Sequence, residues 1–191
     1  TQHSLTLEVD DYGNVRKQAA IGYGRRLGLS PLQGDDRKKQ EQPLITYTEN
    51  GFTNKIAASD AHRTPLPSQS RTYEVTGLRA ATDSNRFIFA EMLGECNAAA
   101  LLDYENAPTS GQKQKRLIEH VRTLYRTNDL TALLPLNVVE SLALPGESYK
   151  LAFTPGLAQQ IYIDSGKLTL AALDNALANE GRYVHSEGDA N

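Results

Sequence analysis

The feature that most constrains this chain is a pair of alternating segments around a cluster of turn-forming residues near its start. Residues 4–10 alternate apolar and polar side chains, which is the period of a strand with one buried face. Residues 10–14 gather Asp, Asn and Gly, which favour tight turns. Residues 15–23 return with a second half-buried strand. The apolar positions of the first strand are Leu5, Leu7 and Val9. This pattern predicts a β-hairpin.

Further strands are expected in the first half of the chain. Residues 44–49 are strand-like, and the Asn50-Gly51 dipeptide suits a tight turn that would pair them with residues 52–58. Residues 71–78 form another predicted strand. Between Leu27 and Gln42 the chain is polar, and we interpret the mixed-charge stretch 34–40 as a solvated loop.

The second half favours helices. Residues 86–104 carry helical material, with Thr82, Asp83 and Ser84 as candidate N-caps. Residues 113–126 give the clearest helical pattern, a single apolar stripe with basic and acidic side chains on the remaining surface. The members of the stripe are Leu117, Ile118, Val121, Leu124 and Tyr125.

Three shorter elements are expected near the end of the chain. Residues 149–153 alternate like a strand. Thr154 and Pro155 then suit the cap and first position of a helix, and residues 168–178 form a last helix that ends before Gly181. The sequence thus predicts an α+β fold, a single domain or fragment over residues 1–191, with antiparallel hairpins in a strand-rich part (1–80) and a helix-rich part (81–191).

Composition excludes several function classes. The formal charge of −3 gives no electrostatic footprint for nucleic acid. One cysteine, Cys96, excludes an intrachain disulfide, and we expect it to be a buried structural thiol. No apolar run approaches the roughly 18 residues of a membrane span, so direct membrane insertion is not expected. The four histidines lack metal-ligand spacing, so we expect no metal and no cofactor; they are His3, His62, His120 and His185.

No catalytic residue emerges from the motifs. Residues 22–28 approach a dinucleotide-binding fingerprint, but the spacing of the last glycine is too long and the chain leads to Pro31 instead of a helix. We interpret Arg25 and Arg26 as ion-pair or strand-end charges, and His120 as a surface residue. Scattered carboxylates could form an acid–base pair only if the fold brought two together; they are Glu8, Glu49, Glu74 and Asp103.

Several segments together resemble the middle/C-terminal region of the B component of insecticidal toxin complexes, which precedes the RHS/YD repeats. The matching segments are residues 5–15, 20–26, 71–78, 115–126, 142–154 and 181–184. They run in order over essentially the whole chain. One departure concerns the repeat signature, which places Tyr before the Asp of the turn where this chain has Val9.

The resemblance implies a non-enzymatic structural segment of a very large secreted bacterial virulence protein. Members of the family form, with a C component, a hollow RHS-type β-shell that encloses a cytotoxic effector, and they dock on a pore-forming A component. This chain would then be a fragment of the shell, with a C component as partner and an A component contacted through the parent protein. An isolated fragment of such a sheet would expose strand edges, so we expect it to dimerise by edge pairing.

Two other classes are alternatives. A carbohydrate- or receptor-binding module would use an exposed strand face, although the chain has no Trp. An ADP-ribosyltransferase is the enzymatic alternative, but its chemistry needs two glutamates, or a glutamine and a glutamate, two positions apart. The sequence contains no such pair.

Overall fold

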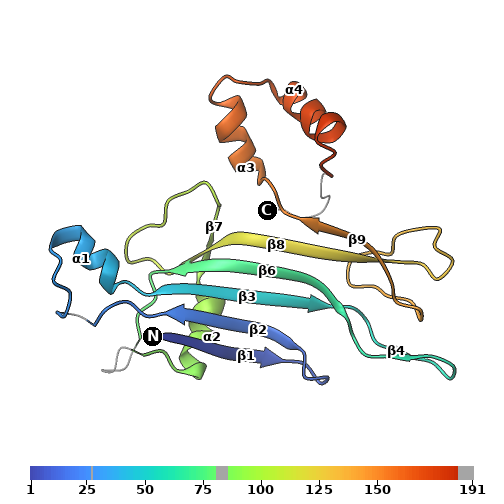
Figure 1. The fold of residues 1–191 in the computed structure, drawn as a ribbon, viewed down its shortest axis with the longest axis horizontal. Helices are drawn as coiled ribbons and strands as arrows, with labels where there is room; N and C mark the ends of the chain where they lie inside the picture. Colours follow the sequence, from blue (N-terminus) through green and yellow to red (C-terminus); the bar gives the residue numbers. More distant parts are fainter. Residues whose placement is uncertain (27, 81–85, 185–191) are drawn as a thin grey trace. The chain divides into compact units, whose positions relative to one another are not determined.

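The computed structural model describes residues 1–26, 28–80 and 86–184, which fold into two compact units (Figure 1). The first unit comprises residues 1–102 and 108–150, and the second comprises residues 103–107 and 151–191. The predicted N-caps Thr82, Asp83 and Ser84 lie outside the described residues, as does His185.

The first unit is built on a seven-stranded sheet with the order β1-β2-β3-β6-β8-β7, in which β9 also pairs with β8. Neighbouring strands are antiparallel, except that β7 runs parallel to β8. A separate pair of short strands joins β4 (Ile56–Ala57) and β5 (His62–Arg63). The strands of the large sheet are β1 (Gln2–Val9), β2 (Val15–Gly22), β3 (Leu44–Phe52), β6 (Pro67–Thr76), β7 (Ala100–Leu102), β8 (Gln114–Arg126) and β9 (Leu144–Lys150).

The first hairpin is confirmed. The Asp10 carboxylate accepts hydrogen bonds from the backbone N–H groups of Tyr12 and Asn14, each at 2.9 Å. Gly13 adopts a φ of +79°, a conformation that glycine takes without steric cost. The turn chemistry read from residues 10–14 therefore does close β1 onto β2.

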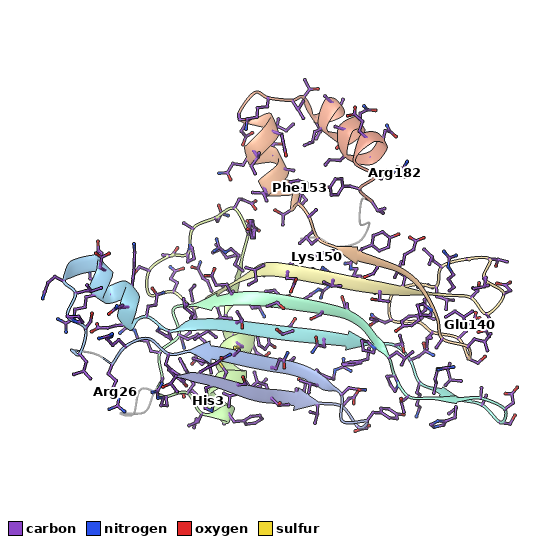
Figure 2. The ribbon with its side chains drawn as sticks, viewed as in Figure 1. His3, Arg26, Glu140, Lys150, Phe153 and Arg182 are labelled. Carbon is purple, nitrogen blue, oxygen red and sulfur yellow. The ribbon has the colours of Figure 1, made fainter. Side chains whose placement is uncertain are left out.

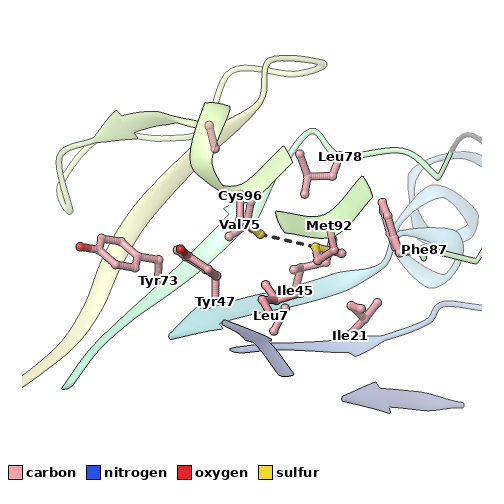
Figure 3. Packing of buried hydrophobic residues seen from close by; sticks show 12 residues of the cluster. Leu7, Ile21, Ile45, Tyr47, Tyr73, Val75, Leu78, Phe87, Met92 and Cys96 are labelled. Atoms are coloured by element: carbon pink, nitrogen blue, oxygen red, sulfur yellow. Dashed lines mark hydrogen bonds between the residues drawn. The ribbon is translucent and has the colours of Figure 1, made fainter. Parts of the chain in front are cut away.

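One face of the sheet carries the core. Helix α2 (Phe89–Ala98) packs there, and its Met92 and Cys96 side chains are fully buried against the strands (Figure 3). The strand residues of this cluster include Leu7, Ala19, Ile21, Ile45, Tyr47, Tyr73 and Val75. They alternate along their strands, as expected of a sheet with one covered face.

The second unit contains two short helical segments. Helix α3 (Pro155–Ala158) continues into the π-helix η1 (Gln159–Ile163), and α4 (Leu170–Asn175) continues into η2 (Ala176–Glu180). The predicted start is confirmed, because the Thr154 hydroxyl accepts from the Leu157 N–H at 3.2 Å and Pro155 occupies the first turn. The predicted end at Gly181 is also confirmed.

The prediction of a helix over residues 113–126 is wrong, and the helix-rich character of residues 81–191 was therefore overestimated. This segment is β8, which pairs with β6 on one side and with β7 and β9 on the other. A β-bulge at Ile118 inserts one residue between the partners of Tyr73 and Thr72. The insertion breaks the alternation of the strand, so its apolar residues fall at spacings that imitate a helix.

Four other predictions differ from the structure. The helical stretch expected over residues 86–104 ends at Ala98, and strand β7 follows it. Asn50 and Gly51 do not form a turn, because β3 continues to Phe52 and pairs with β6 along its length. The stretch interpreted as a charged loop is helix α1 (Gly34–Glu41). The strand predicted over residues 149–153 ends at Lys150.

Candidate functional site

A row of ionisable side chains crosses five strands of the sheet on the face that carries α2. Register places Glu8 of β1 beside Lys17 of β2, followed by Glu49 of β3, Arg71 of β6 and His120 of β8. Lys17 Nζ lies 2.8 Å from Glu8 Oε2. Because neighbours in the row alternate in sign up to Arg71, cross-strand attraction stabilises this register of the strands.

Two buried tyrosines lie on the same face of the sheet, two residues along the strand from Glu49 and Arg71. Tyr47 and Tyr73 are register partners on β3 and β6, and Lys115 Nζ lies 5.5 Å and 5.3 Å from their ring centroids. The same ammonium is 3.9 Å from Glu49 Oε1. Burial raises the pKa of both phenols, and the negative charge of Glu49 raises it further. The phenols therefore stay protonated and are poor bases or nucleophiles at neutral pH.

His120 is not the surface residue that the sequence suggests. It retains 7% of its exposure, and its Nε2 lies 3.3 Å from both Arg122 Nε and Gln69 Oε1. Burial lowers the His120 pKa to about 4, and the positive charges of Arg122 and Arg71 act in the same direction. At neutral pH the imidazole is uncharged, which is how two arginines can share its surroundings.

Cys96 is the buried structural thiol predicted from the sequence. Its side chain is fully buried, and its Sγ lies 3.4 Å from Met92 Sδ within the core (Figure 3). Burial raises the Cys96 pKa to about 11. A thiol that is protonated at neutral pH and closed to solvent cannot serve as a nucleophile.

The candidate carboxylates lie in separate structural contacts. Glu74 accepts from Arg116 Nη2 at 2.6 Å and from Arg116 Nε at 3.1 Å, and Asp103 accepts from Asn106 Nδ2 at 3.2 Å. Glu8 and Glu49 share the charged row but have β2 between them, which separates their backbones by roughly 10 Å. Because Lys17 fills the intervening position, the arrangement is an ion-pair row and not an acid–base pair.

The remaining sequence candidates do not converge. The segment after β2 does not lead into a helix, since α1 begins only at Gly34. Arg26 is exposed in that segment, and His3 lies on β1 (Figure 2). Within residues 1–26, 28–80 and 86–184, no three His, Cys, Asp or Glu side chains are grouped as metal ligands. In the same ranges no helix has the length and apolarity of a membrane span.

One shallow hollow of about 220 Å³ lies at the turn end of the first hairpin. It holds both acidic and basic side chains, and the Asp10 carboxylate is already engaged by the turn. The sequence signalled the turn but not the hollow, because the other half of the lining comes from residues around the end of β3. The lining residues are Asp10, Asp11, Tyr12, Arg16, Phe52, Thr53, Lys55 and Pro65.

Comparison with known proteins finds one sequence family that matches the first part of the chain. Residues 1–66 match the sequence family described as insecticide toxin TcdB middle/C-terminal region. A comparison with curated proteins found no match. Over these residues the match confirms the resemblance to this region of toxin-complex B components that was inferred above from the sequence.

Three solved structures share the fold. They are a crystal structure of TcdB2–TccC3 (16% identity, TM-score 0.60), a mutant Photorhabdus luminescens Tc holotoxin pore (17%, 0.61) and TcdB2–TccC3 without its hypervariable C-terminal region (18%, 0.60). Each similarity covers 92% of this chain and only 8% of the solved chain. The α+β architecture is therefore that of a small segment within these much larger chains.

Proposed function

We propose that this chain is a non-enzymatic structural segment of an insecticidal toxin complex B component. In this role it forms part of the wall of an RHS-type shell that encloses and helps deliver a cytotoxic effector. The observation that carries the proposal is the fold similarity, which extends over 92% of the chain in structures of TcdB2–TccC3 and of a holotoxin pore.

The chemistry of the described residues supports a structural role. The groups that could react are held in contacts that stabilise the fold: Cys96 is in the core, His120 is neutral and buried, and Glu74 is bound to Arg116. A shell wall requires paired strands with one packed face and one wettable face, and it requires no converging reactive groups. The large sheet meets this requirement.

The proposed partners follow from the same similarity. Two of the solved structures contain TccC3 together with TcdB2, so we propose a C component as the direct partner of the parent protein. The holotoxin pore suggests that the parent protein also contacts an A component. The complex would act outside the producing cell.

Two experiments test the proposal in sequence. An antibody raised against this chain is used to blot producing cells, and a band many times larger than 21.0 kDa is expected. The parent polypeptide is then co-expressed with its C component and treated with protease. If the two form a closed shell, the effector part of the C component survives digestion until the shell is opened by denaturant.

Other outcomes would redirect the assignment. A band near 21.0 kDa would mean a free-standing protein, and the shell proposal would be withdrawn in favour of a carbohydrate- or receptor-binding module. Release of nicotinamide from NAD by the purified chain would instead indicate an ADP-ribosyltransferase. We expect no release above the rate of a heat-denatured sample.

A further inference from the structure

Positive charge gathers on the core-bearing face of β6 and β8. Arg71 lies between Glu49 of β3 and His120 of β8, and Arg122 follows two residues along β8. The two arginines are therefore diagonal neighbours, with Cα atoms roughly 7–8 Å apart, which is within reach of long side chains. Lys115 Nζ is 3.9 Å from Glu49 Oε1. Three cations and one carboxylate thus occupy this part of the face, although the whole chain has a net charge of −3.

The flanking strands add no net charge to this region. On one side Lys17 Nζ lies 2.8 Å from Glu8 Oε2. On the other side Arg126 Nη2 lies 3.8 Å from Glu147 Oε1, and the Tyr149 hydroxyl donates to the same carboxylate. Tyr149 is the β9 residue opposite the second arginine, so its contribution there is a neutral phenol.

The buried imidazole responds to this positive charge. Arg122 Nε lies 3.3 Å from His120 Nε2, so the guanidinium donates to an unprotonated ring nitrogen. Burial lowers the pKa of His120 to about 4, and Arg122 and Arg71 lower it further. Burial also lowers the pKa of Arg122, and Arg71 again acts in the same direction. A negative group between the two guanidinium groups would oppose these electrostatic effects.

We propose that Arg71 and Arg122 together bind a doubly charged oxyanion of the sulfate or phosphate class, beside the imidazole of His120. A guanidinium presents its N–H groups as a planar fork, which matches two oxygens of one anion. Two such forks at diagonal positions suit a tetrahedral anion with two charges, and a halide cannot satisfy them. Both arginines are half-buried, so their attraction for the anion is screened less than that of fully exposed charges. Once the anion is bound, His120 can accept a proton and become a further donor.

The first test measures the protonation of His120 by NMR in sodium sulfate and in sodium chloride of equal ionic strength. Sulfate is the probe because it stays doubly charged over the range in which the imidazole titrates. The His120 signal is identified by its absence from His120→Gln. Sulfate should raise the pKa of His120 by about one unit or more. Because protonation and anion binding are linked reciprocally, a shift of one unit means that the protonated chain binds sulfate about tenfold more tightly.

A second readout comes from the arginine side chains of the unaltered protein. The Nε–H signals of Arg71 and Arg122 should move with sulfate and saturate, whereas that of Arg126, which is already paired with Glu147, should not. Arg122→Gln should abolish the sulfate response of His120, and Arg126→Gln on the same strand is the matched control that keeps it.

Three results would each overturn the oxyanion site. They are equal effects of sulfate and chloride, a response of Arg126 as large as that of Arg122, and a folded Arg122→Gln variant with the full response of His120. The Nε–H measurement needs no substitution in the site, so it decides the matter even if Arg122→Gln does not fold. None of these results bears on the size of the parent polypeptide, so the shell proposal is tested separately.

Discussion

Gly77 shows how a single residue can decide the path of the chain. It follows β6 with a φ of +75°, and a Cβ atom built on it would lie 1.8 Å from the Gln112 carbonyl oxygen. A residue with a side chain would therefore be strained by this backbone conformation and would also clash with the backbone at Gln112. The chain can leave β6 toward α2 only because this position carries no side chain.

Gly77→Ala should destabilise the first unit by several kcal/mol, because the clash is with backbone and cannot be relieved by a side-chain rotation. The control is Gly94→Ala in the middle of α2, where a Cβ meets nothing within 4 Å. That change should stabilise the unit by about 0.5–1 kcal/mol. Urea denaturation gives both values. Similar effects of the two substitutions would contradict the geometry at Gly77.

His120 should make the stability of the first unit dependent on pH. In the unfolded chain it binds a proton near its ordinary pKa of about 6.5, whereas in the folded chain the pKa is lowered to about 4 by burial and by Arg122 and Arg71. Between these values the unfolded state binds more protons, so the free energy of unfolding falls as the pH falls. The loss is about 3 kcal/mol at most.

The measurement is urea denaturation of the unaltered chain and of His120→Gln between about pH 7 and pH 4.5. Carboxylates titrate in both proteins, so the difference between them isolates the imidazole. The unaltered chain should lose more stability than the variant on acidification. Parallel curves for the two proteins would show that His120 is already exposed or charged in the folded state.

At the scale of elements, one amide side chain joins two loops that are distant in sequence. Asn54 Oδ1 accepts from the Val139 N–H at 2.8 Å, and Asn54 Nδ2 donates to the Val139 carbonyl at 3.1 Å. The Asn54 amide thus makes a reciprocal pair of hydrogen bonds with the backbone of the buried Val139, as a neighbouring strand would. Ser68, which is also buried, donates to Asn137 Oδ1 at 2.6 Å and strengthens the same junction.

Asn54→Ala should therefore cost about 1–3 kcal/mol, because it leaves the polar backbone groups of Val139 without their partner. Asn179→Ala is the control, since within the described part of the chain its amide donates to Asn175 Oδ1 on an exposed helical surface. That change should stay within about 0.5 kcal/mol. Equal losses for both variants in chemical denaturation would argue against the junction between the loops.

Elements defined by neighbouring residues could be predicted, and those defined by distant partners could not. The first hairpin follows from local alternation and from Asp10 and Gly13, and the start of α3 follows from Thr154. The strand β8 was mistaken for a helix because its identity depends on three partner strands and on a bulge at Ile118. Asn50 and Gly51 likewise lie within a strand that β6 extends.

The same division applies to the candidate site. Cys96 was predicted correctly because a free cysteine without a metal-binding or catalytic motif around it is usually buried. His120 and the row of charges could not be predicted, because each neighbour in the row comes from a different strand and the register is set by the whole sheet. The alternation of negative and positive side chains exists only across neighbouring strands, so no single segment of the sequence contains it.

At the scale of the whole molecule, burial is unevenly distributed between the two units. The first unit holds a continuous core that runs from Leu7 to Ala99. In the described part of the second unit, only Ala158 and Leu173 are buried. Local opening requires less free energy where fewer apolar contacts are broken. The two units should therefore differ in the rate at which their amide hydrogens exchange with solvent.

Hydrogen exchange of the full chain should show the slowest amides at residues 45–47 and 73–75, and faster exchange over residues 155–180. Two substitutions separate the units. Val75→Ala removes buried side-chain volume from the sheet core and should accelerate exchange only in the first unit, whereas Leu173→Ala should accelerate only residues 155–180. If either substitution accelerated both sets of amides, the two units would open as one cooperative structure and would not be independent in stability.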